Sequence, residues 1–134
     1  DEYKSLGSAW HKDSVITFNV PELDSTKRYN VFLNLRDNDN YPYNNLFLIV
    51  TLETPNGFTK VDTLEYKMAA PDGTLLGDGF TDIKESKLFY KESVRFRGKY
   101  KVQIKQAVRE SGKVPGVTQL EGITDIGLRI ETLE

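Results

Sequence analysis

Hydrophobic and polar residues alternate one by one in two stretches near the end of the chain, residues 100–104 and 126–130. Successive side chains of a β-strand point to opposite faces, so this pattern predicts two strands with one buried face each. The polar connection between them, residues 110–122, is longer than most hairpin loops. Connections of this length usually carry function or cross to another sheet.

The same alternation recurs earlier in the chain, where turn residues separate the predicted strands. Further strands are expected at residues 15–20, 29–36, 46–50, 63–68, 75–80 and 88–96. The run at 46–50 is apolar at every position and predicts a central strand covered on both faces. Asn56-Gly57 predicts a tight hairpin turn with positive φ values.

Two stretches depart from simple alternation. Residues 82–85 are compatible with one helical turn, and Ala107 with Val108 predicts a bulge near Lys105 or Gln106. A helix at 123–130 is the alternative to the last strand, because three isoleucines there also have helical spacing. Gly127 and the β-branched residues argue against that helix.

About eight strands at roughly ten-residue spacing are typical of an all-β sandwich or barrel. We predict an antiparallel two-sheet sandwich, jelly-roll-like, in a single domain at residues 13–134. A lead-in at residues 1–12, which carries the only Trp and the only His, is expected to dock onto it.

The composition excludes several classes of protein. The formal net charge of -2 provides no basic field for nucleic acid. No apolar run approaches the length of a membrane-spanning helix. The absence of cysteine excludes disulfides, thiolate metal sites and a cysteine nucleophile in this sequence. Because the first residue is not Met, we expect a trimmed sequence whose targeting segment lies upstream.

Two groups of residues are candidates for ligand binding. Asp37 and Asp39, in the run Asp-Asn-Asp-Asn, offer the oxygen ligands that calcium prefers, but the glycine and glutamate of an EF-hand loop are missing. A turn is therefore the favoured interpretation, and no metal or other cofactor is expected. Trp10, Tyr41 and Tyr43 are compatible with an aromatic platform for a sugar, although such residues more often lie at a core edge.

No catalytic motif is visible, so we expect a protein that is not an enzyme. The single histidine, His11, falls in the lead-in, where it does not predict a triad. A hydrolase would need two carboxylates that converge in a cleft. Asp125, Arg129 and Arg109 are compatible with an ion pair across the closing sheet, for which a structural role is favoured.

The order of motifs along the chain resembles the gliding-motility lipoproteins of the GldH type. The matching segments are DEYKSL, YNVFLNLRDNDNYPYNNLFLIV, DTLEYKMAAPDGTLLGDGFTDIKESKLFYKESVRF and GKYKVQIKQAVRESGKVPGVTQLEGITDIGLRIE. They cover nearly the whole chain. The set N-L-R, Y-P-Y-x-N-L-F, D-T-L-E-Y and E-G-I-T-D-I-G is specific in combination.

This resemblance implies a lipoprotein of the cell envelope, anchored to a membrane through a cysteine just upstream of Asp1 and facing the periplasm. It implies partners among the envelope proteins of the gliding apparatus and of the secretion machinery coupled to it. It brings no catalytic residues. We therefore expect a non-enzymatic binding or scaffolding component; the alternative is a carbohydrate-binding module of jelly-roll type.

Partner contacts are expected in two loops, residues 37–45 and 110–122, because loops held by a rigid sheet carry a large share of binding residues. Arg109, Lys113 and Val114 are the candidate partner-binding residues of the second loop.

Overall fold

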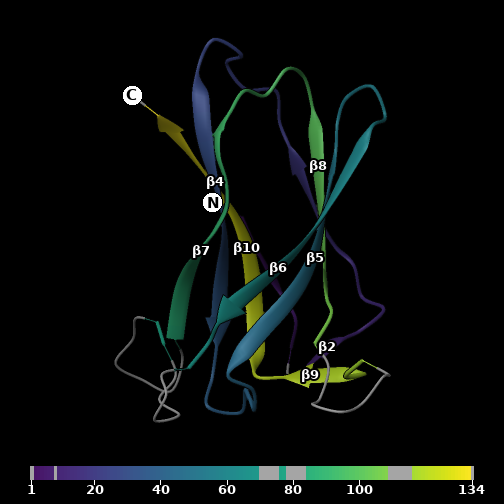
Figure 1. Ribbon diagram of the computed structural model, residues 1–134, viewed down its shortest axis with the longest axis vertical. Helices are drawn as coiled ribbons and strands as arrows, with labels where there is room; N and C mark the ends of the chain where they lie inside the picture. Colours follow the sequence, from purple (N-terminus) through teal and green to yellow (C-terminus); the bar gives the residue numbers. More distant parts are fainter. Residues whose placement is uncertain (1, 8, 70–75, 78–83, 109–115, 134) are drawn as a thin grey trace.

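The computed structural model describes residues 2–7, 9–69, 76–77, 84–108 and 116–133. Within these ranges the chain forms ten strands and no helix (Figure 1). The strands are β1 (Glu2–Ser5), β2 (Ala9–His11), β3 (Ile16–Val20), β4 (Arg28–Asp37), β5 (Asn45–Glu53), β6 (Thr59–Lys67), β7 (Lys84–Val94), β8 (Tyr100–Gln106), β9 (Gln119–Glu121) and β10 (Ile123–Leu133). No helix that could cross a membrane occurs in the described part of the chain.

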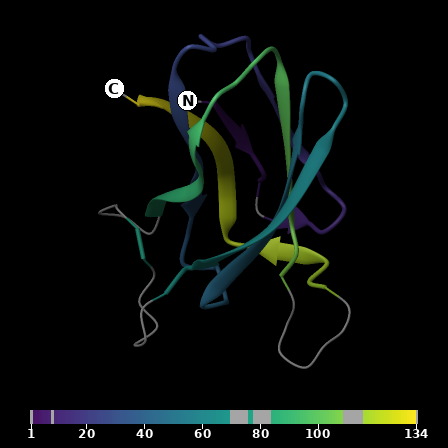
Figure 2. The ribbon, with the colours of Figure 1, turned by 45° about the horizontal axis from the view of Figure 1, so that its top comes forward.

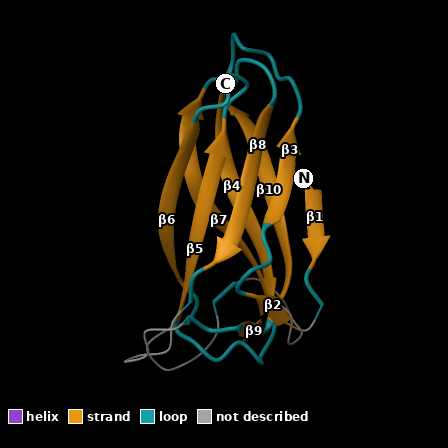
Figure 3. Ribbon diagram, turned by 90° about the vertical axis from the view of Figure 1, so that its right-hand side faces the viewer, coloured by secondary structure: helices purple, strands orange, loops and turns teal. Residues whose placement is uncertain are grey.

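Eight of the strands form two antiparallel sheets that lie face to face (Figure 3). Sheet I has the order β1-β10-β4-β7, and sheet II has the order β3-β8-β5-β6. The two short strands β2 and β9 pair with each other at one end of the sandwich, opposite the end where the C-terminus lies (Figures 1 and 2).

The strand pairing defines a jelly roll. When β2 and β9 are set aside, the first strand pairs with the last, the second with the next to last, and so on inward: β1 with β10, β3 with β8, β4 with β7, and β5 with β6. A long antiparallel hairpin rolled over two sheets in this way has jelly-roll topology. The predicted fold class, an antiparallel jelly-roll sandwich, is confirmed.

The core lies between the inward faces of the two sheets and follows the period-two pattern of the sequence. In β4 the side chains of Val31, Leu33 and Leu35 are buried, and in β8 those of Val102 and Ile104 are buried. Each such side chain contributes roughly 1.5–3 kcal/mol when it leaves water. Residues that are buried but polar are Asn34, Asp37 and Gln106.

The open side of the sandwich, between the edge strands β6 and β7, is closed by polar contacts. The Lys91 ammonium lies 3.3 Å from the Asp62 carboxylate, and the Tyr66 hydroxyl donates to the backbone oxygen of Phe89 at 2.7 Å. One residue of each pair lies on sheet I and the other on sheet II. These contacts link the sheets where no strand pairing joins them.

The structure corrects several local predictions. Strand β5 is not covered on both faces, because Phe47 and Ile49 are half-buried and only the alternate residues are fully buried. This is the usual state of an antiparallel sheet with one face on the core. In the β5–β6 hairpin only Gly57 has a positive φ, at 87°, and Asn56 does not. The last predicted strand is confirmed, because β10 covers residues 123–130, where a helix was the disfavoured alternative.

Other predictions concern residues 75–85 and 105–122. The predicted strand at 75–80 lies almost entirely outside the described residues, and so does the start of the predicted helical turn at 82–85, whose last two residues begin β7. No register shift occurs between β8 and β5 near Gln106; the shifts lie where β4 pairs with β10 and β7. The long connection after β8 crosses from sheet II to sheet I, as one of the two predicted alternatives required.

The short link between β9 and β10 passes very close to the turn that follows β4. The backbone N–H of Asn38 donates to the oxygen of Gly122 at 2.8 Å. Gly122 has a φ of +91°, and a Cβ placed on it would lie 2.3 Å from the backbone nitrogen of Tyr41. Only glycine combines this backbone conformation with so close an approach of another backbone segment.

Gly122→Ala is therefore expected to lower the free energy of unfolding by about 3 kcal/mol or more, because the added methyl group must displace the backbone at Tyr41. Gly57→Ala is a matched control: its φ of +87° is similar, but nothing lies within 4 Å of the added Cβ. It should cost only about 1 kcal/mol. Chemical denaturation of both variants measures the difference, and equal losses would contradict the proposed steric role of Gly122.

Candidate functional site

The two loops predicted to bind a partner meet at one end of the sandwich, which we call the loop end. It consists of residues 38–44, β2, β9 and residues 116–118, and it is seen at the bottom of Figure 1. The contact between Asn38 and Gly122 joins the two predicted loops directly. The predicted partner-binding residues Arg109, Lys113 and Val114 lie outside the described residues.

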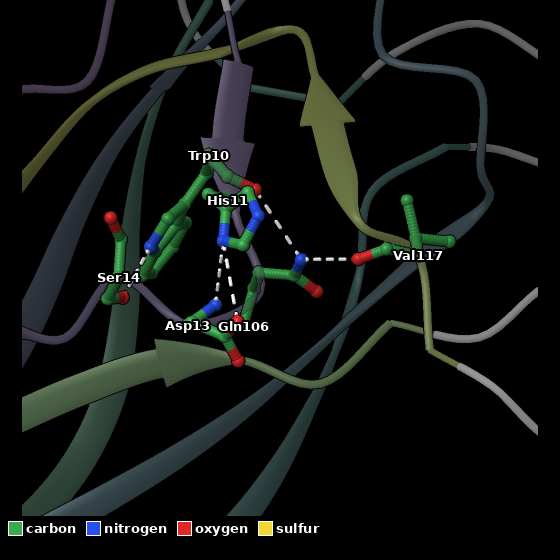
Figure 4. Close-up of polar contacts among 6 residues, drawn as sticks. All are labelled: Trp10, His11, Asp13, Ser14, Gln106 and Val117. Atoms are coloured by element: carbon green, nitrogen blue, oxygen red, sulfur yellow. Dashed lines mark hydrogen bonds and ion pairs between the residues drawn. The ribbon is translucent and has the colours of Figure 1, made fainter.

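Gln106 is the polar side chain that holds the loop end together (Figure 4). It is 3% exposed, and its Nε2 donates to the backbone oxygens of Val117 at 2.8 Å and Trp10 at 3.3 Å. Its Oε1 accepts the N–H of Val108 at 2.9 Å. One buried amide thus satisfies backbone groups from β2, from the segment that follows β8 and from the segment before β9. Loss of such a group would leave buried partners unpaired.

Trp10 and Tyr41 belong to the core of the loop end. The Trp10 side chain is 1% exposed and its Nε1 donates to the backbone oxygen of Ser14 at 2.9 Å. Tyr41 is 5% exposed, its hydroxyl donates to the backbone oxygen of Asn45, and burial raises the pKa of that hydroxyl. Tyr43 is half-buried, with its ring edge-on to Tyr41 at a centroid distance of 5.9 Å.

A sugar would have to displace Trp10 and Tyr41 from the core before it could stack on their rings. The residues predicted as an aromatic platform therefore have a packing role in this conformation. Ligand binding by them remains a prediction, and the burial gives no support to the carbohydrate-binding alternative.

His11, the last residue of β2, makes a local contact within the loop end (Figure 4). Its Nδ1 accepts the backbone N–H of Asp13 at 3.0 Å, and the carboxylate of Asp13 lies 3.8 Å from the same nitrogen. The imidazole thereby stabilises the turn that follows β2.

The residues after β4 form a turn, as the sequence favoured. The Asn38 side-chain oxygen accepts the N–H of Asn40 at 2.9 Å, and its backbone oxygen accepts the N–H of Tyr41 at 3.1 Å. Asp39 and Asn40 are exposed at the tip of this turn. Across the described ranges, no three His, Cys, Asp or Glu side chains are grouped so as to hold a metal ion.

Asp37, the last residue of β4, is the one predicted ligand-binding carboxylate that is wholly buried. Neither of its oxygens has a hydrogen-bond partner among the described residues. Burial raises the pKa of this carboxyl group to about 6; the nearby Lys84 acts in the opposite direction and Asp39 adds slightly to the rise. The charged form of Asp37 therefore opposes folding at neutral pH.

A concave site, separate from the loop end, lies on the outer face of sheet I. It is a groove of about 340 Å³, lined by Tyr3, Asn34, Arg36, Glu85, Ser86, Lys87 and Arg129. Arg129 was predicted to join an ion pair with Asp125 and Arg109. The structure pairs its Nε with Glu131 at 2.6 Å, while Asp125 accepts a hydrogen bond from the Thr124 hydroxyl at 2.9 Å.

Comparison with known proteins gives consistent relatives over almost the whole chain. The sequence profile of a family described as GldH lipoprotein matches residues 1–130. A Flavobacterium johnsoniae protein named gliding motility lipoprotein GldH is 79% identical over 131 residues, which span 98% of this chain and 82% of that protein. A Christiangramia forsetii protein named gliding motility lipoprotein GldH homolog is 55% identical over 133 residues, again 98% of this chain and 82% of that protein.

Solved structures add little. A chain in the structure of the infectious bursal disease virus Gx strain has a TM-score of 0.40 and 13% sequence identity, and the match spans 99% of this chain and 31% of that one. The VP2 subviral particle of the same virus gives a TM-score of 0.38 at 16% identity, with 96% and 30% of the two chains covered. Likeness at this level carries no argument about this protein.

Asp37→Asn is expected to stabilise the protein at neutral pH. The carboxyl group keeps its proton to about pH 6 in the folded state but loses it near its ordinary value of 3.8 in the unfolded state. Stability of the unmodified protein should therefore fall as pH rises from about 4 to 6, and the amide removes this loss. At pH values above about 7, the free energy of unfolding should rise by roughly 1–3 kcal/mol.

Denaturant unfolding at several pH values measures this effect. The exposed Asp39→Asn is the control and should change the pH dependence far less than Asp37→Asn does, because Asp39 is the smallest contributor to the rise in the Asp37 pKa. An Asp37→Asn protein that is no more stable than the original at neutral pH would contradict the inferred state of Asp37.

Proposed function

The chain belongs to the GldH lipoprotein family, and we propose that it acts as a non-enzymatic binding or scaffolding component of the gliding apparatus and of the protein-secretion machinery coupled to it. We place it in the cell envelope, anchored to a membrane by lipid and facing the periplasm. The names of its relatives support the gliding and lipoprotein parts of this proposal. Its partners would be other envelope proteins of that apparatus.

The observation that carries the binding role is the construction of the loop end. Two connections far apart in the sequence are joined there by the hydrogen bond between Asn38 and Gly122. The Gln106 side chain holds the backbone of β2 and of the segment before β9 through two further hydrogen bonds. Polar side chains such as Asp39 and Glu121 project from this supported surface and are exposed. Loops held by a rigid sheet are common sites of partner recognition, because little ordering entropy is lost on binding.

The described part of the loop end offers features suited to recognition. Its carboxylates Asp39 and Glu121 face solvent. Its histidine, His11, accepts a hydrogen bond within its own turn. Arg109, Lys113 and Val114 remain proposed partner contacts in the same connection.

Charge reversal at the loop end tests this proposal. The double variant Asp39→Lys/Glu121→Lys should reduce recovery of envelope partners about tenfold, because opposed charges at an interface disfavour association. The measurement is quantitative mass spectrometry of proteins cross-linked to the tagged, lipid-anchored protein in Flavobacterium johnsoniae cells that lack their own 79% identical relative.

Glu22→Lys/Glu92→Lys is the matched control. It makes the same change in net charge at two exposed positions near the start of β4, at the opposite end of the sandwich. This variant should recover the same proteins as the unmodified chain. Equal recovery with both double variants would remove the loop end from the proposed interface.

A further inference from the structure

The groove on the outer face of sheet I follows from the register of its four strands. Tyr3 lies opposite Gly127, Gly127 opposite Asn34, and Asn34 opposite Lys87, so one row of positions crosses the whole sheet. Gly127 contributes no side chain to this row, whereas its neighbours Tyr3 and Asn34 do. The surface of the sheet is therefore depressed at β10. Neighbouring strands are about 4.8 Å apart, so the four strands span about 14 Å, the length of roughly four extended residues.

One side of the groove is formed by Arg36. Its Nε donates to the Glu85 carboxylate at 2.7 Å, and its guanidinium carbon lies 4.1 Å from the centroid of the Tyr3 ring. The ring and the carboxylate together fix the plane of the guanidinium. The bond to Glu85 raises the pKa of Arg36, so the group is charged under all ordinary conditions.

The other side is formed by two cations that share one carboxylate oxygen. Lys87 Nζ and Arg129 Nε each lie 2.6 Å from Oε2 of Glu131. The Lys87 ammonium also lies 4.2 Å from the centroid of the Phe32 ring. Hydrogen bonds from Lys87 and then from Arg129 lower the pKa of Glu131. Glu131 therefore bridges two cations on this side of the groove.

Exposed ion pairs contribute little to the stability of a fold. Three of the seven lining residues are basic and one is acidic. Asp125, which lies opposite Arg36 in the strand register, accepts a hydrogen bond from Thr124, and its charge also acts on Arg36. Guanidinium groups held in a fixed plane are well suited to bidentate recognition of carboxylates.

The same residues distinguish between two kinds of acidic ligand. The cations lie over faces of the Tyr3 and Phe32 rings, and those faces are not open for stacking by a sugar. Asn34, which is 7% exposed, lines the floor of the groove with a side-chain amide that matches the amides of a peptide backbone. The lining therefore favours a peptide over an acidic sugar.

We propose that this groove binds an extended acidic segment of a partner protein, with side-chain carboxylates that pair with Arg36 at one side and with Lys87 and Arg129 at the other. Glu131 occupies the position of a ligand carboxylate when the groove is empty and competes with it. The site is separate from the loop end and does not depend on the role proposed there.

Binding of a fluorescent hexaglutamate peptide to the purified chain, followed by anisotropy at low ionic strength, tests the proposal. Arg129→Gln and Arg36→Gln should each weaken binding about fivefold or more, because each removes a charged donor. Glu131→Gln should strengthen binding about threefold or more, since it removes the competing carboxylate. Raised ionic strength should weaken binding to the unmodified chain.

Lys101→Gln is the control, because Lys101 forms a comparable pair with Glu53 at 3.9 Å on sheet II and should leave binding unchanged. Hexalysine and a neutral Gly-Ser hexapeptide should not bind. Circular dichroism and unfolding curves establish that every variant is folded, and the Glu131→Gln gain in affinity cannot arise from misfolding.

Three results would overturn the proposal: no hexaglutamate binding at low ionic strength, no gain in affinity on Glu131→Gln, or tighter binding of an oligogalacturonate than of the peptide. The last result would assign the groove to acidic sugars. Because the Asp39→Lys/Glu121→Lys variant leaves the groove residues intact, hexaglutamate binding by that variant separates failure at one site from failure at the other.

Discussion

Burial of two facing sets of apolar side chains is the constraint on which the rest of the structure depends. Residues such as Leu33 on β4 and Ile104 on β8 leave water only when sheet I lies on sheet II. Period-two alternation then fixes which side chains point outward, and outward side chains on β1, β4, β7 and β10 form most of the groove lining. The core thus determines the outer surface as well, through the pleat of the strands.

The nested strand pairing explains why the loop end exists. Strands β4 and β8 lie in different sheets but run in the same direction (Figure 1). The connections that follow them therefore emerge at the same end of the sandwich. The Gly122 backbone and the Gln106 amide then join the two connections at short range. The loop end and the groove on sheet I are two separate surfaces of this fold for contact with other proteins.

The sequence predicted the strands and their inward faces well, because alternation is a local property: β3 and β4 were found within a residue or two of their bounds. It did not predict which strands pair, and therefore not which residues distant in the sequence lie side by side. Tyr3 and Arg129 come from opposite ends of the chain and meet only through the register of β1 and β10. Burial of Trp10 depends in the same way on β9, which pairs with β2. Gln106, which reads as an ordinary polar residue, is buried because three backbone segments need its amide.

If the protein acts through a recognition surface at the loop end, charge reversal there must stop gliding. Single-cell gliding speed would be measured in Flavobacterium johnsoniae whose own 79% identical relative is replaced by this chain, with equal envelope levels of each variant. We expect Asp39→Lys/Glu121→Lys to abolish gliding and Glu22→Lys/Glu92→Lys to support it fully. Normal gliding with the first variant would contradict a recognition role of the loop end.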